Sequence, residues 1–392
     1  MSQQPNYTFA FLLEQTLGHR THSQNLQANV PKDGTVRPLW GPIEWNLSGL
    51  AARLPVYNSN WTIRAGVRAR QTLRRIQRTT TVDALFVHTQ VPAVLLADWM
   101  QRLPTVVSLD ATPQQYDALG THYAHQRGPS WLETLKWRAN QRCFQQARQI
   151  VAWSQWTKDS LIAEYGVPEA NVTVIPPGVN SREWTRRTPR QQPATTAEAV
   201  KILFVGGDLQ RKGGTLLLDA FRQLRQTQAA VGQGPAVELH LVTRDSVAAE
   251  PGLFVYSDMQ PNSTPLKALF HQADIFCLPT YGDCLPMVLS EAGAAGLPLV
   301  ATQVGGIGEI VKEGETGFLI PTGDGAALTT ALRTLVANPT VRLDAGAQAA
   351  ALVQREFDAE RNTERLLTLL KHCVTDKATS QAPRASHLAS VR

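Results

Sequence analysis

The amino-acid sequence predicts an α/β protein whose parallel sheets are covered by helices on both faces, a doubly wound architecture. Short apolar, β-rich runs alternate with helical patterns from one end of the chain to the other. A length of 392 residues exceeds the size at which one hydrophobic core keeps growing, so two domains with a cleft between them are expected. A segment poor in large apolar residues near the middle of the chain gives their boundary.

The apolar runs are continuous rather than alternating, which is typical of strands buried on both faces of a parallel sheet. The first half of the chain contains YTFAFLLE (7–14), DALFVH (83–88), TVVSLD (105–110), QIVAWS (149–154) and VTVIPPG (172–178). The second half contains VKILFVGG (200–207), VELHLVT (237–243), LFVYS (253–257), ADIFCLP (273–279), LPLVAT (297–302) and GFLIP (317–321).

The domain boundaries follow from composition. We place the first domain at 1–180 and the second at 200–355, joined by a linker over 181–199. Most of that linker, TRRTPRQQPATTAEA, is rich in Thr, Pro, Gln and Arg. A helix is expected over 356–375. The last residues, 376–392, have little apolar surface to bury and are expected to be a disordered tail.

The net charge of +6 suits a partner that carries phosphate. Six arginines fall within WTIRAGVRARQTLRRIQR (61–78), where Ala65, Ala69, Leu73 and Ile76 have helical spacing. This is the pattern of an amphipathic helix with a cationic face, which either is solvated or contacts an anionic membrane surface. Nucleic acid is not expected as a partner, because no recognised motif or aromatic platform accompanies the arginines.

The sequence favours neither a membrane-spanning nor a secreted protein. No stretch approaches the ~18 consecutive apolar residues that a spanning helix needs. The start of the chain lacks a basic segment ahead of a secretory apolar core, so we expect a cytoplasmic protein, with peripheral contact at the inner membrane face as the alternative. The four cysteines lack the spacing of metal ligands, so reduced, buried thiols and no metal site are expected.

The second domain opens with a strand followed by a candidate anion site. Gly206 and Gly207 let a ligand approach the backbone, and Arg211 and Lys212 place two cations at the mouth of the next helix. This field suits a diphosphate. A plain turn between strand and helix with exposed basic residues would also explain the stretch.

The stretch YGDCLPMVLSE (281–291) supplies a second half of the site. Pro286 predicts a helix start, which leaves the N–H groups of Met287, Val288 and Leu289 free to face an anion. Two carboxylates, Asp283 and Glu291, then lie beside the helix end. We interpret them as acceptors for sugar hydroxyls, one on the ribose and one on a second sugar. The alternative is that they only stabilise the positive end of the helix.

A third loop, VATQVGGIGEIVKEGETGFLIP, follows a predicted strand with Gly305, Gly306 and Gly308, and Glu309 stands at another helix entry. Loops at the carboxyl ends of parallel strands converge on one crevice, so we expect the three loops to form a single site.

Four stretches together resemble the family 4 glycosyltransferases of GT-B fold: FVGGDLQRKGG, PTYGDCLPMVLSEAGAAGLPLVAT, VGGIGEIVKEGETGFLIP and AWSQWTKDSLIAEYGVPEANVTVIPPGVN. The resemblance runs from about residue 83 to 372 and is strongest over 150–323. It implies two Rossmann-like domains facing across a cleft, the C-terminal one binding a nucleotide-diphospho-sugar, UDP- or GDP-linked. It also implies that the helix at 356–375 packs back onto the first domain.

On the donor side, the family's pair of acids separated by seven residues falls on Asp283 and Glu291. The resemblance implies that Glu291 binds the ribose and that Asp283 lies by the donor sugar. Arg211 and Lys212 match the basic diphosphate binders, and the backbone around Leu285, Met287 and Val288 is expected to hold the diphosphate. Two positions depart from the family: Asp283 is usually Glu, and Gly207 is Arg in many members, which leaves Arg211 as the substitute cation.

On the acceptor side, Asp110 stands where the family often has a histidine near the reaction centre, and either orients a substrate hydroxyl or caps a turn. Gly18 lies where the family has a glycine-rich loop that touches the donor phosphates. His19, His22 and His88 are acceptor-side candidates, each either structural or catalytic.

The resemblance implies a retaining, metal-independent transfer of a sugar to an acceptor hydroxyl on a glycan, a lipid-linked or a small-molecule acceptor. No resident cofactor is expected, and the donor phosphate itself is expected to take the acceptor's proton. Two other readings remain at this point: a sugar-nucleotide epimerase of the same fold, and a non-catalytic nucleotide-sugar-binding protein. Tryptophans of the first domain, among them Trp45 and Trp61, are candidates to stack on acceptor sugar rings; the alternative, expected for most of them, is that they fill the core or an interface.

Overall fold

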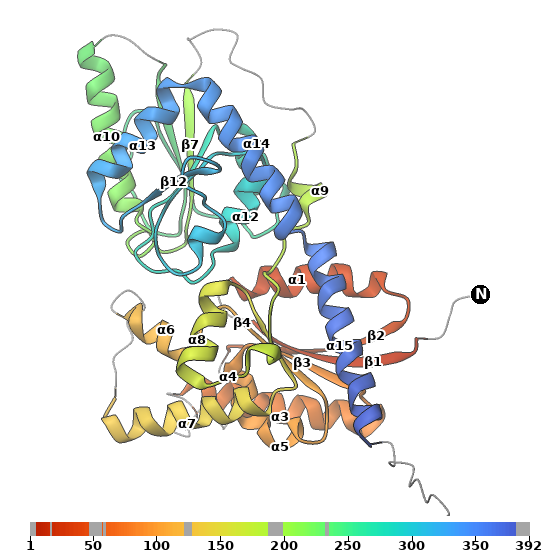
Figure 1. The fold of residues 1–392 in the computed structure, drawn as a ribbon. Coiled ribbons are helices and arrows are strands. Elements are labelled where there is room, and N and C mark those ends of the chain that lie inside the picture. Colours follow the sequence, from red (N-terminus) through yellow and green to blue (C-terminus); the bar gives the residue numbers. More distant parts are fainter. Residues whose placement is uncertain are drawn as a thin grey trace, which may run out of the picture.

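A computed structural model describes residues 5–15, 18–46, 57, 60–120, 128–186, 199–231 and 235–381. It contains two six-stranded sheets, one in each half of the chain, and every strand pairing is parallel (Figure 1). Among the described helices, none combines the length and the apolar character that crossing a bilayer requires.

The N-terminal sheet has the order β2-β1-β3-β4-β5-β6. Its strands are β1 (Tyr7–Glu14), β2 (Val36–Ile43), β3 (Ala84–His88), β4 (Thr105–Leu109), β5 (Gln149–Ala152) and β6 (Val172–Val174). The C-terminal sheet has the order β12-β11-β10-β7-β8-β9. Its strands are β7 (Val200–Val205), β8 (Val237–Val242), β9 (Leu253–Tyr256), β10 (Ile275–Leu278), β11 (Leu299–Thr302) and β12 (Gly317–Ile320).

The eleven predicted runs all contain a strand, but the sequence pattern misses β2. This strand carries Pro38 and Pro42, which cannot donate to a sheet ladder. It lies at the sheet edge and pairs only with β1, so one side of its backbone needs no partner strand.

Helices cover both faces of each sheet, as the doubly wound prediction requires (Figure 1). In the N-terminal domain they are α1 (His19–Asn29), η1 (Val30–Lys32), α3 (Trp61–Thr79), α4 (Gln90–Ala93), η3 (Val94–Leu96), α5 (Ala97–Met100), α6 (Pro113–Ala118), α7 (Ser130–Gln146), α8 (Gln155–Tyr165) and η5 (Glu169–Asn171). The rest of the chain contributes α9 (Ser181–Trp184), α10 (Gly214–Val231), α11 (Thr264–Gln272), α12 (Met287–Ala294), η6 (Ile307–Glu309), α13 (Gly325–Ala337), α14 (Pro339–Glu356) and α15 (Ala359–Gln381).

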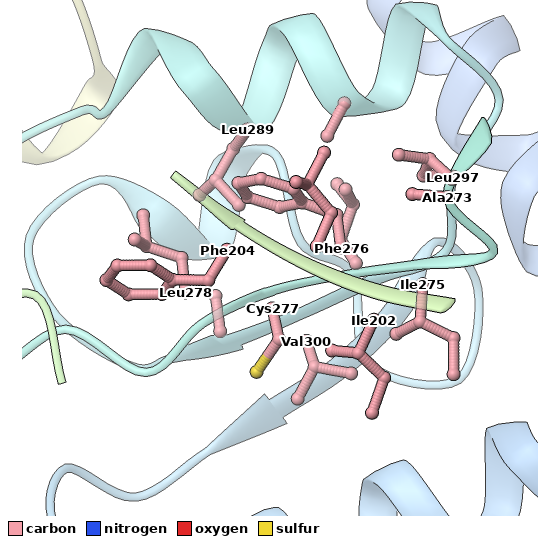
Figure 2. Close-up of a cluster of buried hydrophobic side chains, with 14 of the residues drawn as sticks. Ile202, Phe204, Ala273, Ile275, Phe276, Cys277, Leu278, Leu289, Leu297 and Val300 are labelled. Atoms are coloured by element: carbon pink, nitrogen blue, oxygen red, sulfur yellow. The ribbon is translucent and has the colours of Figure 1, made fainter. Parts of the chain in front are cut away.

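Alternation along the strands divides the N-terminal core into two layers. Phe9 and Phe11 of β1 face one side of the sheet with Leu26 of α1, whereas Ala10 and Leu12 face the other side with the buried stripe of α3. The C-terminal sheet is buried in one large cluster, and Figure 2 shows apolar side chains of β7, β10, β11 and α12 gathered within it. The loops at the strand ends are thus anchored on two sheets with buried cores.

The C-terminal helix α15 leaves the second domain and packs on the first, as the resemblance implies. Leu366, Leu367 and Leu370 lie in the same cluster as Phe9 and Phe11. The helix continues to Gln381, so the tail prediction is wrong over 376–381; the remaining residues, 382–392, lie outside the described part of the chain.

The linker prediction is also wrong at its start. Residues 181–184 form α9, and Trp184 is buried in the C-terminal cluster, where its carbonyl oxygen lies 2.8 Å from His271 Nε2. Trp184 is a large aromatic residue in an otherwise polar stretch, which is a signal of burial. The average composition of the stretch obscured this signal. Residues 187–198 of the predicted linker lie outside the described residues.

Candidate active site

The two domains meet where the carboxyl ends of their strands face each other. Glu309 at the end of η6 accepts hydrogen bonds from the backbone N–H groups of Gln155 (2.9 Å) and Trp156 (3.1 Å), which open α8 in the other domain. The carboxylate thus neutralises the positive end of that helix across the domain boundary. Glu309 was predicted to bind the donor; in this structure it joins the domains.

Lys212 and Asp283 form the central ion pair of the C-terminal loops. Lys212 Nζ lies 2.7 Å from both carboxylate oxygens of Asp283, and Arg211 Nη1 lies 3.6 Å from Oδ1. Arg211 also donates to the carbonyl of Gly282 at 2.8 Å. Asp283 is buried, so both cations that were predicted to bind a diphosphate converge on one enclosed carboxylate.

The turn after β7 brings a third cation to this edge, one that the sequence interpretation missed. Gly206 and Gly207 follow the strand, and a Cβ atom on Gly207 would lie 2.8 Å from Nη2 of Arg244, the residue shortly after β8. The Arg244 side chain is exposed and has no carboxylate partner among the described residues. The only sequence signal was its place after the strand VELHLVT, which pairs beside β7.

The N-terminus of α12 is the second anion-binding element. Pro286 occupies the N-cap, one position earlier than the helix start predicted for it. Leu289 N donates to the Pro286 carbonyl at 3.1 Å, so the prediction of three free N–H groups is wrong by one. Met287 and Val288 retain unpaired backbone donors within the described structure, because the first turn of a helix offers them no acceptor.

Glu291 lies one turn further along α12 and is 6% exposed. Its carboxylate has no hydrogen-bond partner among the described residues. Burial raises the pKa of Glu291 to about 7, with a small opposing effect from the charge of Lys267. A buried acid without a donor is poised to accept hydrogen bonds from hydroxyl groups.

The third loop packs against the second rather than opening toward a ligand. Gly305 has φ of +56°, and a Cβ atom there would come within 2.4 Å of the Asp283 carbonyl oxygen. The Gly306 N–H donates to the Cys284 carbonyl at 2.7 Å, so this group, predicted to bind the donor, is occupied. Both glycines allow the two loops to touch, which fixes the position of Asp283.

On the N-terminal side, His19 lies between two carboxylates at the ends of strands. Its Nδ1 is 3.7 Å from Glu14 Oε2 at the end of β1, and its Nε2 is 3.7 Å from Asp110 Oδ2 just after β4. Burial disfavours the imidazolium, but the hydrogen bonds and charges of Asp110 and Glu14 outweigh it and raise the pKa of His19 to about 10. The two carboxylates therefore favour the protonated, cationic form of His19.

The two carboxylates have further partners. Tyr116 donates to Asp110 Oδ2 at 2.7 Å, while Glu14 accepts from Trp61 Nε1 and Thr89 Oγ1, each at 2.6 Å. Burial opposes ionisation of Asp110, yet His19 and Tyr116 hold its pKa below the usual value. Glu14 was missed by the sequence interpretation, although an acid that ends an apolar strand is a recognisable signal.

The remaining candidates of the N-terminal domain are the acceptor-side histidines His22 and His88 and the donor-side Gly18. His22 and His88 are buried around Trp153, and His88 stacks on its indole at 5.1 Å. Burial, with the charge of His19, lowers the pKa of His22 to about 3 and that of His88 well below its usual value, so both are neutral wall residues. Gly18 caps α1 and is exposed, with open space where a Cβ would lie.

The two sides of the site approach each other around Cys284. Burial raises the pKa of its thiol, and the charges of Asp110 from one domain and Asp283 from the other add to that effect. Lys212 and Arg211 thus contact Asp283 directly, and Asp110 of the other domain is near enough for its charge to act on the same thiol. In the described part of the chain, no three His, Cys, Asp or Glu side chains are arranged to hold a metal ion.

Comparison with known proteins places this geometry in a class. Solved structures align over nearly the whole chain: sucrose-phosphate synthase from Thermosynechococcus elongatus has a TM-score of 0.68 at 16% identity, covering 94% of this chain and 100% of that one. HepE of Anabaena in complex with UDP and glucose has a TM-score of 0.63 at 16% identity, covering 93% and 99%. Two Rossmann-like domains with facing strand ends define a GT-B fold.

The family follows from sequence. The profile described as "Glycosyltransferase Family 4" matches residues 36–183, and that described as "Glycosyl transferases group 1" matches 199–338. The chain belongs to the family 4 glycosyltransferases.

Curated relatives share more sequence identity with the chain than these solved structures do, but some match over only part of their length. D-inositol 3-phosphate glycosyltransferase of Pseudarthrobacter chlorophenolicus is 28% identical over 53% of this chain, and the match spans about half of that protein, 52%. Glycogen synthase of Mycobacterium tuberculosis is 25% identical over 81% of this chain and 80% of its own length.

Proposed function

We propose that this protein is a retaining glycosyltransferase that moves a sugar from a nucleoside diphosphate, UDP- or GDP-linked, to a hydroxyl group of an acceptor glycan, lipid-linked or small-molecule acceptor, without a metal ion. The observation that carries the proposal is the convergence on one enclosed edge of cations, a helix N-terminus and the unpaired carboxyl of Glu291. Those are the complements of a diphosphate and of sugar hydroxyls.

Donor binding exchanges one set of partners for another. Asp283 holds Lys212 and Arg211 at the site before the donor enters. A diphosphate carries more charge than one carboxylate and competes for both cations. Asp283 is then released toward hydroxyls of the donor sugar. Arg244 adds a cation that has no carboxylate partner in the described structure.

Glu291 binds the ribose. Burial raises the pKa of its carboxyl to about 7, so the proton can be lost close to neutral pH. Two ribose hydroxyls would donate to the ionised form and stabilise it, so donor binding and loss of the proton are linked. The backbone N–H groups of Met287 and Val288 bind the diphosphate at the same helix end.

Asp110 acts on the acceptor side. His19 and Tyr116 fix its carboxylate in one orientation, and this carboxylate positions a hydroxyl of the acceptor or of the donor sugar. The anomeric carbon breaks its bond to the leaving phosphate oxygen and forms one to the acceptor oxygen on the same face. The acceptor proton passes to a phosphate oxygen, while Arg211 and Lys212 stabilise the departing diphosphate.

A ligand panel followed by a transfer assay tests the proposal. UDP-, GDP- and ADP-linked sugars are screened for a rise in the thermal unfolding midpoint, because a ligand at 100 times its Kd stabilises by about 2.7 kcal/mol. The stabilising donor is then incubated with glycan, glycolipid and small-molecule hydroxyl acceptors. Sugar transfer is expected. Donor turnover into an epimer without acceptor, or binding with no transfer to any acceptor class, would contradict it.

A further inference from the structure

The positive charge of the protein is concentrated on one part of the N-terminal domain. The segments 61–79, 97–102 and 130–146 contain ten Arg and Lys residues against two acidic residues, Asp98 and Glu133, although the whole chain has a net charge of only +6. These segments form α3, α5 with the residues after it, and α7, which all pack against η3 or α4 beside it. Figure 1 shows them on the side of this domain away from the C-terminal domain.

Several of these ten basic side chains have interaction partners within the protein. Arg64 is buried over the rings of Trp45 and Trp61, and Arg70 is paired with Asp98 at 2.9 Å. Arg68 donates to the backbone carbonyls of two residues that follow β2. The exposed arginines without a carboxylate partner in the described structure are Arg74, Arg75, Arg78, Arg138 and Arg142.

Two large apolar side chains accompany them on α7. Trp131 is 68% exposed and Leu135, one turn later, is 57% exposed. Arg138 and Arg142 continue the same exposed face of the helix. By contrast, the apolar stripe of α3 is buried against the sheet, so α3 offers charge but no apolar surface for insertion.

We propose that the face formed by α3, α5 and α7 docks the protein on an anionic lipid surface. Trp131 and Leu135 enter the headgroup region, and the exposed arginines without a carboxylate partner lie over the lipid phosphates. Charge complementarity favours an anionic partner. Burying the leucine beside the tryptophan in lipid is favourable, whereas a nucleic acid offers no apolar surface for it, so lipid is the favoured partner. The inference is separate from the donor site and would bring a lipid-linked acceptor to the enzyme.

Vesicle co-sedimentation of the full chain tests this assignment. Binding is expected to vesicles containing roughly 30% phosphatidylglycerol in phosphatidylcholine, and to fall steeply when NaCl rises from about 0.05 M to about 0.5 M. The variants Arg138→Glu/Arg142→Glu and Trp131→Ser/Leu135→Ser are each expected to reduce the bound fraction roughly tenfold.

Matched controls separate the surface from general effects. Arg182→Glu/Arg333→Glu changes net charge equally, and Val255→Ser/Val341→Ser removes exposed apolar groups elsewhere; both should bind vesicles like the parent. Unchanged thermal midpoints verify folding of every variant. Absence of vesicle binding, equal loss in a control pair, or displacement from vesicles by a short RNA that binds through the same arginines would overturn the proposal.

Discussion

Lys212 donates to both carboxylate oxygens of Asp283 at 2.7 Å, joining the loops that follow β7 and β10. The pair occupies the place where the proposal puts the leaving diphosphate. The pair therefore holds the Lys212 cation in a mostly buried, fixed position, from which it can shift to a more strongly charged anion.

Lys212→Met is expected to lower kcat/KM by about 10²-fold or more, because it removes a preorganised charge on the leaving group. Lys212→Arg keeps the charge and should retain part of the activity. The measurement is steady-state kinetics with the selected donor. A Lys212→Met enzyme with parental kcat/KM would rule out the role of Lys212.

A cation introduced at position 207 should compensate for the loss of Arg244. Arg244→Ala is expected to weaken donor binding by roughly tenfold, the loss of one charge-assisted contact. Gly207→Arg alone crowds the Arg244 guanidinium, whose Nη2 lies 2.8 Å from the position of a Cβ. The double variant places a cation in the vacated space and should recover donor affinity, measured by calorimetry. Failure of the double variant to improve on Arg244→Ala would refute this assignment.

His19 is expected to make the free energy of unfolding depend on pH in the alkaline range. Its pKa is raised to about 10 by Asp110 and Glu14, against the effect of burial, so its stabilising charge is fully present below about 6.5 and is lost as pH rises through about 10. The free energy of unfolding should fall between pH 8 and 10.5 by an amount on the order of 2 kcal/mol or more. His19→Gln should lose that dependence; urea unfolding at several pH values measures it.

Glu291 should also make stability fall as pH rises, but in a lower pH window. Burial raises its pKa to about 7, so the folded state holds a proton that the unfolded state releases above about 4.5. Stability is therefore lost as pH rises from about 4.5 through about 7, by an amount on the order of 2–3 kcal/mol. Glu291→Gln is expected to remove this loss and to be more stable than the parent at pH 8. If Glu291→Gln leaves the pH dependence of the unfolding free energy unchanged, ionising Glu291 in the folded protein costs no stability and the prediction is wrong.

The loop contact at Gly305 is expected to tolerate no side chain. Its φ is +56°, and a Cβ would lie 2.4 Å from the Asp283 carbonyl oxygen. Gly305→Ala should lower the free energy of unfolding by about 1–3 kcal/mol and displace the Lys212–Asp283 pair, reducing activity. Gly314→Ala is the control, because it has a similar φ of +72° with no neighbour near the Cβ. Equal effects at both positions would mean that backbone strain alone is responsible.

The sequence predicts much of the architecture, because buried parallel strands leave continuous apolar runs. It fails at β2, where edge position makes prolines acceptable, and at α9, where Trp184 anchors a stretch of linker-like composition. The position of Gly206, Gly207, Arg211 and Lys212 after β7 was also predictable, since these residues directly follow an apolar strand in sequence.

Pairings between distant loops were not predictable. Glu309 was expected at the donor, but the carboxylate reaches α8 of the other domain. Glu14 and Arg244 each lie at or after the end of an apolar strand, which is a visible signal, but their partners depend on which strands are neighbours and on how side chains from separate loops share space. A sequence pattern carries neither kind of information.

Donor binding by Glu291→Gln tests the central claim most directly. Calorimetric titration of the best donor from the sugar-nucleotide panel into parent and variant at pH 8 compares an ionised carboxylate with an amide of the same shape. The account predicts affinity at least roughly tenfold weaker in the variant, the worth of a hydrogen bond to a charged group, with lower turnover. Equal affinity together with equal turnover would contradict it.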